Sequence, residues 1–268
     1  MRGDMKGLFF LFVMMSTAFC TPQSANLAFA AFNAFEAGQY ASAWGQYSHA
    51  LLSAKKEANT QVEVTILLNM AQIQVHSEEW DLVDSLLTDI HYPLNNDQKI
   101  IFEQIRGRMA EQKKQCSDWT NSPIFPSQNQ SLNGLYFICQ AQTHSPTFSD
   151  EKLDQYAQSF SKKAGFPHFI KGKVHFTLGR YDLAQKELSE ALNRAQKAEK
   201  YFMCATTLEL LAQNAEALKQ NKEAGDYYKR SAEVFERLGL QKPFKRNALK
   251  ALEFNPQIES LRKALQSL

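Results

Sequence analysis

The sequence YASAWGQYSHALLSA, residues 40–54, returns in altered form as YDLAQKELSEALNRA, residues 181–195. Each stretch begins with tyrosine, has alanine at its fourth, eleventh and fifteenth positions, and has a bulky residue at its eighth. Spacings of three and four residues bring these side chains to one face of a helix. Because alanine lets a second helix approach closely, the pattern predicts helices that pack tightly in pairs.

Two weaker copies of the pattern follow the strong ones at a fixed distance. The steps from Ala43 to Val83 and from Ala184 to Ala224 are both 40 residues. A helical run and a short turn precede each copy, so the repeating unit is helix, turn, helix. Such a unit cannot cover its own apolar faces, and its neighbours must stack into a curved array with a concave surface.

The turn and second helix of each strong unit carry the residues of a known repeat. These residues are Gly38, Tyr40, Ala43, Tyr47 and Ala50 in one unit, and Gly179, Tyr181, Ala184, Leu188 and Ala191 in the other. Here the chain resembles the tetratricopeptide repeat family, over residues 25–94 and 152–238. The resemblance implies an all-α, right-handed solenoid of helical hairpins. It also implies that polypeptide partners bind in the concave groove, without catalysis and without a cofactor.

These patterns divide the chain into five parts. We expect a signal peptide at residues 1–20, two tetratricopeptide-like repeats at 21–95, a degenerate helical unit with a Cys116–Cys139 loop at 96–150, two further repeats at 151–240, and capping helices at 241–268. The capping helices are expected to have a polar outer face, because the last unit of a repeat array meets solvent.

The first 20 residues have the organisation of an export signal. Arg2 and Lys6 precede an apolar run at residues 8–15, and small residues follow, which is typical of a secretory signal peptide. The run is too short to cross a membrane, which takes about 20 apolar residues. Cys20 ends a segment that resembles a bacterial lipoprotein cleavage box, except that bulky Phe19 stands where the box has a small residue. Lipidation of Cys20 is therefore the alternative to simple cleavage.

Export changes the interpretation of the cysteines, because an oxidising compartment permits disulfides. Cys116 and Cys139 bracket a polar stretch that a bridge would hold in place, and we expect them to form a disulfide. Cys204 lies in a strongly helical run, where a cysteine usually serves as a small buried hydrophobic residue. Together these patterns predict an exported protein of the bacterial envelope, in the periplasm or associated with the outer membrane.

Formal charges nearly cancel, because 30 Lys and Arg against 28 Asp and Glu leave +2. This is too little for a general attraction to nucleic acid. Residues 1–150 carry 9 basic and 14 acidic side chains and the remainder carry 21 and 14, which gives −5 and +7. The basic cluster of Lys242, Lys245, Arg246 and Lys250 would suit phosphates or an acidic partner, whereas the interspersed acidic residues favour an ordinary solvated surface.

No pattern of residues predicts catalysis or a metal site. Gly172-Lys173 resembles the end of a phosphate-binding loop, but Val174 replaces the hydroxyl residue that such a loop needs. His168 and His175 are seven residues apart, about 10 Å along a helix, which is too far to share a metal ion.

Two alternatives to a polypeptide-binding scaffold remain open. A helical module could bind a small molecule or glycan, which would require a deep pocket with converging polar groups. An enzyme could be built in the irregular insert, which would require polar residues of 117–134 to converge with His144.

The repeat register identifies positions on the first helices that face the concave side. They combine aromatic rings, which supply apolar area, with polar groups that fix the orientation of a partner. The predicted partner-binding residues are Phe32, Phe35, Gln72, His76, Phe169, Lys173, Phe176, Gln213 and Glu216. For any one phenylalanine, packing in the core is an equal alternative. The sequence thus predicts a non-catalytic scaffold for other envelope proteins or peptides.

Overall fold

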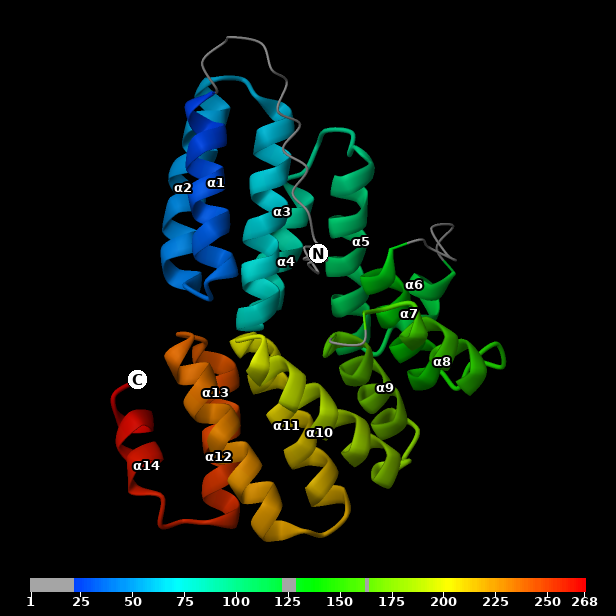
Figure 1. Ribbon diagram of the computed structural model, residues 1–268. Helices are drawn as coiled ribbons and strands as arrows, with labels where there is room; N and C mark the ends of the chain where they lie inside the picture. Colours follow the sequence, from blue (N-terminus) through cyan, green and yellow to red (C-terminus); the bar gives the residue numbers. More distant parts are fainter. Residues whose placement is uncertain (1–21, 122–128, 162–163) are drawn as a thin grey trace.

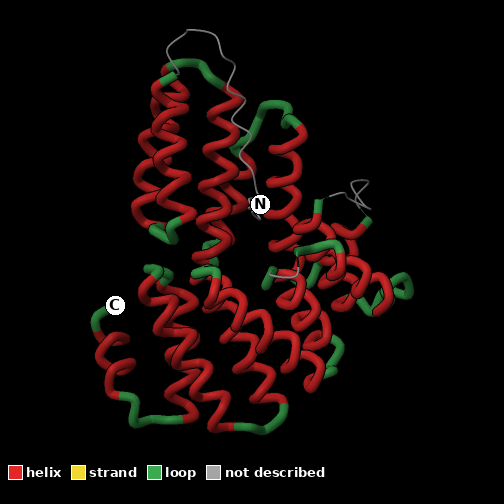
Figure 2. The backbone as a smooth tube through the Cα atoms, in the orientation of Figure 1, coloured by secondary structure: helices red, strands yellow, loops and turns green. Residues whose placement is uncertain are grey.

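The computed structural model describes residues 22–121, 129–161 and 164–268, and every regular element within them is a helix (Figures 1 and 2). The helices are α1 (Gln23–Glu36), α2 (Tyr40–Lys56), α3 (Thr60–Ser77), α4 (Trp80–Thr88), α5 (Asn96–Gln112), α6 (Cys116–Thr120), α7 (Gln130–Gln142), α8 (Asp150–Gln158), α9 (Phe166–Thr177), α10 (Tyr181–Lys197), α11 (Tyr201–Ala217), α12 (Asn221–Arg237), α13 (Gln241–Phe254) and α14 (Glu259–Gln266). The predicted signal peptide and Cys20 lie outside the described residues.

The alanines of the repeat pattern lie where helices pack most closely. Ala43, Ala184 and Ala224 are fully buried, and so is Leu188 on α10. On the facing helix α9, a Cβ added to Gly172 would lie 2.6 Å from Leu188 Cγ. Small residues on both helices of a hairpin therefore set their separation. The predicted helical-hairpin solenoid is confirmed.

Most helix pairs are joined by a sharp turn that needs a left-handed residue. Gly38 and Gly179, which the sequence pattern singled out, have φ of 74° and 71°. At such a position the chain's N–H groups bond back to the last carbonyls of the helix, and glycine fits there without strain. Residues with a side chain also occupy this conformation, among them Lys219 after α11 with φ of 61°.

Replacing Lys219 with glycine is therefore expected to stabilise the protein. Its side chain is exposed, so the change removes backbone strain without removing packing, and the free energy of unfolding should rise by about 1 kcal/mol. Urea denaturation would measure the change. Lys219→Ala is the control, because alanine keeps the strain and should give no comparable gain. An equal rise in both variants would contradict this explanation.

The helices form two groups that α6, α7 and α8 connect (Figure 1). We call α1 to α5 the N-terminal arm and α9 to α13 the C-terminal arm. One apolar cluster lies within α3 to α5, a second, which we call the central apolar cluster, joins α5 to α11, and a third contains residues of both α1 to α3 and α11 to α14. Because this third cluster includes helices from both ends of the sequence, the two arms touch each other directly.

The last two helices differ in their surroundings. We expected residues 241–268 to be capping helices, and in the structure α14 packs on α13. Helix α13 buries Phe244, Ala248 and Ala251, packs along α12 and also contacts α3 in the opposite arm. It therefore joins the two arms in addition to following the last repeat.

The central unit contains the expected disulfide. Cys116 at the start of α6 is bonded to Cys139 on α7, and both are buried. Trp119 on α6 packs so closely against Gly107 of α5 that an added Cβ would lie 2.5 Å from the indole ring. The short helix α6 is thus fixed to both α5 and α7. Residues 122–128 of the polar insert, which the enzyme alternative requires, lie outside the described residues.

Candidate partner-binding site

The predicted groove residues lie on α1, α3, α9 and α11, the first helices of their hairpins. On α11, the residues Phe202, Glu209, Gln213 and Glu216 follow each other at intervals of seven, four and three. These intervals place them along one face of the helix. This face combines one ring, two carboxylates and an amide, which is the mixture that polypeptide recognition requires.

Two of the predicted residues, Phe35 and His76, meet in an aromatic cluster. The His76 ring stacks on Phe202 with a centroid distance of 3.9 Å and an interplanar angle of 10°. Phe35 lies 5.4 Å from the same imidazole, and Tyr40 approaches it edge-on at 5.2 Å. The cluster therefore joins the last turns of α1 and α3 and the first turn of α2 to the start of α11. Sequence reasoning missed Tyr40 and Phe202 as members of this site.

The environment of His76 favours its neutral form. Its Nδ1 atom is buried and has no hydrogen-bond partner among the residues that the structure describes. Burial, followed by the positive charge of Arg108, lowers the pKa of His76 to about 3. At neutral pH the imidazole is therefore uncharged, and it packs against the neighbouring rings as an apolar aromatic group.

A half-buried ion pair holds a third predicted residue, Lys173. Lys173 Nζ on α9 contacts Glu111 Oε1 at the end of α5, and Arg108 Nη1 lies 3.5 Å from the other oxygen of that carboxylate. Burial alone would raise the pKa of Glu111, but the charges and hydrogen bonds of Lys173 and Arg108 outweigh it and lower the pKa. The Glu111 carboxylate on α5 therefore fixes the position of the Lys173 side chain on α9.

The predicted polar positions are partly accessible. Gln72 and Gln213 are half-buried, and Glu216 is half-buried as well. Glu216 accepts a hydrogen bond from the Tyr228 hydroxyl at 2.9 Å and lies 3.5 Å from Lys250 Nζ. Its carboxylate is therefore oriented by α12 and α13, and Gln213 lies beside it on the same face of α11.

The remaining phenylalanines divide between core and surface. Phe169 is 6% exposed and belongs to the central apolar cluster, so it has little surface to offer a partner. Phe32 and Phe176 are half-buried, and Phe176 also packs near Tyr181 with a centroid distance of 5.9 Å. Of the predicted rings, Phe32 and Phe176 can thus contribute some apolar area.

The basic cluster near the C-terminus has carboxylate partners inside the chain. Lys242 Nζ lies 2.7 Å from Glu79, and Lys250 Nζ lies 2.9 Å from Glu253. Arg246 bonds to both Glu78 and Glu209. These cations are therefore neutralised in part by acidic residues, three of which are far away in the sequence.

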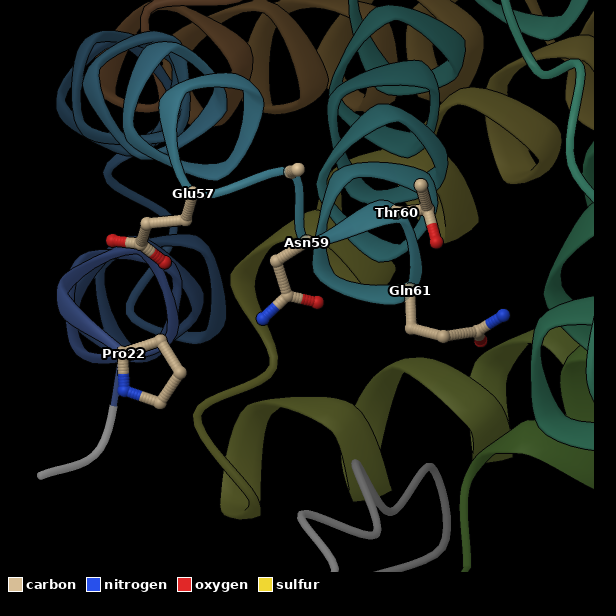
Figure 3. Close-up of a pocket in the computed structure, with 6 residues that line it drawn as sticks. Pro22, Glu57, Asn59, Thr60 and Gln61 are labelled. Atoms are coloured by element: carbon tan, nitrogen blue, oxygen red, sulfur yellow. The ribbon is translucent and has the colours of Figure 1, made fainter. Parts of the chain in front are cut away.

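Two hollows are lined by described residues. One, of about 450 Å³, is lined by Pro22, Glu57, Asn59, Thr60 and Gln61, with Ala58 (Figure 3). Its polar groups are already engaged, because Glu57 accepts a hydrogen bond from the Ser24 N–H at 3.1 Å and Asn59 caps α3. The other hollow, of about 580 Å³, lies where the α1–α2 turn meets α11 and the end of α12.

The described residues show no arrangement for metal chemistry. Within residues 22–121, 129–161 and 164–268, no group of three or more His, Cys, Asp or Glu side chains is placed to hold a metal ion. Over the same residues, no helix combines the length and the apolar character needed to cross a membrane.

The fold and this site define a class of protein. Antiparallel helix pairs, stacked with small residues at their contacts and carrying polar and aromatic groups on one face, make the chain a helical-hairpin repeat protein. Residues 169–252, from α9 into α13, match the tetratricopeptide repeat family model. No match was found among curated proteins. Residues 169–252 therefore contain tetratricopeptide repeats, a kind of repeat that generally mediates protein–protein interaction and is typically non-catalytic. The hairpins α1 to α4 have the same form but lie outside the matched residues.

Proposed function

We propose that the protein is a non-catalytic scaffold of the bacterial cell envelope that binds partner polypeptides on its concave side. The observation that carries the proposal is the mixed face of α11, with Gln213 and Glu216 half-buried beside each other, within the segment that matches the tetratricopeptide family. A half-buried polar face can exchange solvent for the hydrogen-bonding groups of a polypeptide, and nearby rings supply apolar area.

Two observations support an exported protein. The sequence of residues 1–20 has the charged start, apolar run and small residues of a signal peptide. The Cys116–Cys139 disulfide is of a kind that persists in oxidising compartments. Mass spectrometry of the mature N-terminus tests this part of the proposal. A free Phe19 or Thr21 would indicate simple cleavage, and a diacylglycerol group on Cys20 would indicate a lipoprotein.

Site-specific photo-crosslinking in the native organism tests the partner-binding face. A benzophenone amino acid at Gln213 is expected to crosslink to envelope polypeptides, because this half-buried position lies on the mixed polar and aromatic face of α11. The same amino acid at Lys186, which is exposed on the second helix α10, is the control and should give far fewer products. Equal crosslinking at both positions, or none at Gln213, would contradict the proposed site.

A further inference from the structure

The two arms meet through surfaces of opposite charge. The tips of the N-terminal arm carry Glu36, Glu78 and Glu79, at the ends of α1 and α3. The facing tip of the C-terminal arm carries Lys200, Lys242 and Arg246, at the starts of α11 and α13. The pairs are Lys200 with Glu36 at 3.9 Å, Lys242 with Glu79 at 2.7 Å, and Arg246 with Glu78. We call these pairs, together with the His76–Phe202 stack, the closing contact.

Arg246 is the most specifically bound group of the closing contact. Its two terminal nitrogens engage both oxygens of Glu78, with Nη2 to Oε1 at 2.8 Å. Its Nε donates to Glu209 Oε1 on α11, also at 2.8 Å. This two-pronged geometry is how arginine selects a carboxylate. Glu209 belongs to the same arm as Arg246 and fixes the orientation of its guanidinium. The two terminal nitrogens of Arg246 therefore point toward Glu78 of the other arm.

The closing contact also contains the aromatic ring of Phe202. Phe202 presents its face to His76, and 6.3 Å separates its centroid from that of Phe235 in the core of the C-terminal arm. Phe202 is therefore anchored in its own arm and extends toward the other. Phe202 therefore offers a flat apolar surface to His76, and the Arg246 fork binds the carboxylate of Glu78, two residues further along the chain. The occupant of this surface is the sequence HSEE, residues 76–79.

The link across the closing contact differs from the packing within each arm. Neighbouring helices of a hairpin share long faces of buried alanine and leucine. The arms instead touch by helix ends and turns, with an apolar contact between Gly38 and Leu238 beside the ion pairs. In these pairs the side chains of Lys200, Lys242 and Arg246 remain 59%, 54% and 42% exposed. Ion pairs between side chains this exposed are individually weak and are screened by salt. A competing segment with the same chemistry can therefore displace the tip of α3 from this surface.

We propose that Phe202, Lys242 and Arg246 form a docking surface for acidic polypeptide segments with an adjacent ring, and that the tip of α3 occupies it in the closed form. This inference rests on the proposed function and specifies the chemistry of the partner. It also accounts for the division of net charge, −5 in residues 1–150 and +7 in the remainder. The acidic half supplies the internal occupant, and the basic half supplies the surface that binds it.

Binding of a defined peptide tests the docking surface. The probe is a fluorescent peptide with the sequence of residues 73–82, IQVHSEEWDL, and fluorescence anisotropy measures its dissociation constant. Glu78→Gln with Glu79→Gln weakens the internal occupant without adding a charge. This variant is expected to bind the probe at least tenfold more tightly than the wild type.

Adding Arg246→Glu to the variant should abolish the gain, whereas adding Arg180→Glu should preserve it. Arg180 is a matched control, because its pair with Asp150 is similarly exposed but lies outside the closing contact.

A distance measurement checks that the arms separate. Spin labels at positions 41 and 236, both exposed on opposite sides of the contact, should report a longer distance in the Glu78→Gln, Glu79→Gln variant than in the wild type. Circular dichroism confirms that each variant is folded. The proposal is overturned if the arms separate without a gain in probe binding. It is also overturned if a probe with both glutamates changed to glutamine, or a short single-stranded DNA, binds equally well. These measurements contain no envelope protein, so a failure of crosslinking at Gln213 is a separate result.

Discussion

Replacing both Cys116 and Cys139 with alanine is expected to lower the free energy of unfolding by about 3 kcal/mol. The bridge closes a loop with a sequence separation of 23 residues, and losing it gives the unfolded chain more conformational freedom. The folded state has little means of compensation, because α6 is only five residues long and is held by this bond and by Trp119. Urea denaturation of the variant and the wild type measures the difference.

Cys204→Ala is the control for this experiment. Cys204 is a free, buried cysteine on α11, so its replacement removes a thiol from the interior without opening a loop. Its effect should be clearly smaller. A reducing agent should destabilise the wild type and the Cys204 variant, but leave the double variant unchanged. Equal urea midpoints for the wild type and the double variant would mean that α6 and α7 hold the loop without the bond.

The repeat architecture could be predicted because its determinants are local. Ala43, Tyr47 and Ala50 lie within two turns of one helix, and all three are fully buried. Spacing within a helix fixes which side chains share a face. The requirement for stacking then follows, because a single hairpin cannot bury both of its apolar faces. The same reasoning located the left-handed turn residues Gly38 and Gly179.

The contact between the arms could not be predicted in this way. His76 and Phe202 are separated by 126 positions in the sequence, and their approach depends on the sum of small rotations from one helix pair to the next. The irregular unit α6 to α8 adds a further change of direction that no repeat pattern encodes. Phe35 and His76 were predicted for the groove, and the structure places His76 in the closing contact with Phe35 packed against its imidazole. The opposite net charges of the two halves were the one signal of this contact in the sequence.

Individual groove residues were hard to assign from the repeat register alone. Phe169 and Lys173 are four residues apart on α9, yet Phe169 is in the core and Lys173 reaches Glu111 on α5. A helix that packs against neighbours on two sides exposes only a narrow face. Spacing in the sequence does not determine which of two adjacent positions lies on that face. Lys173 was predicted from the register, but its ion pair with Glu111 depends on the path of the chain through α5 and α7.

Lowering the pH from 7 to 5 is expected to reduce the free energy of unfolding by about 2 kcal/mol through His76. The pKa of this residue falls from 6.5 to about 3 on folding. Between these values the unfolded chain binds a proton at His76 that the folded chain excludes. The contribution of neutral His76 is therefore complete above pH 6.5, and it is lost progressively as the pH falls from 6.5 toward 3. The groups around the imidazole do not oppose this loss, because Phe35, Tyr40 and Phe202 are uncharged and Arg108 is positive.

His76→Phe isolates this contribution, because phenylalanine keeps a ring against Phe202 but cannot take up a proton. Urea denaturation at pH 7 and pH 5 should show the variant losing about 2 kcal/mol less than the wild type. Since His76 lies in the closing contact, spin labels at positions 41 and 236 should also report acid-induced separation of the arms in the wild type and not in the variant. His175→Phe is the control, because burial also lowers the pKa of His175 but it lies on α9, away from the closing contact. Arms that separate at pH 5 in the His76 variant as readily as in the wild type would show that another group senses the acid.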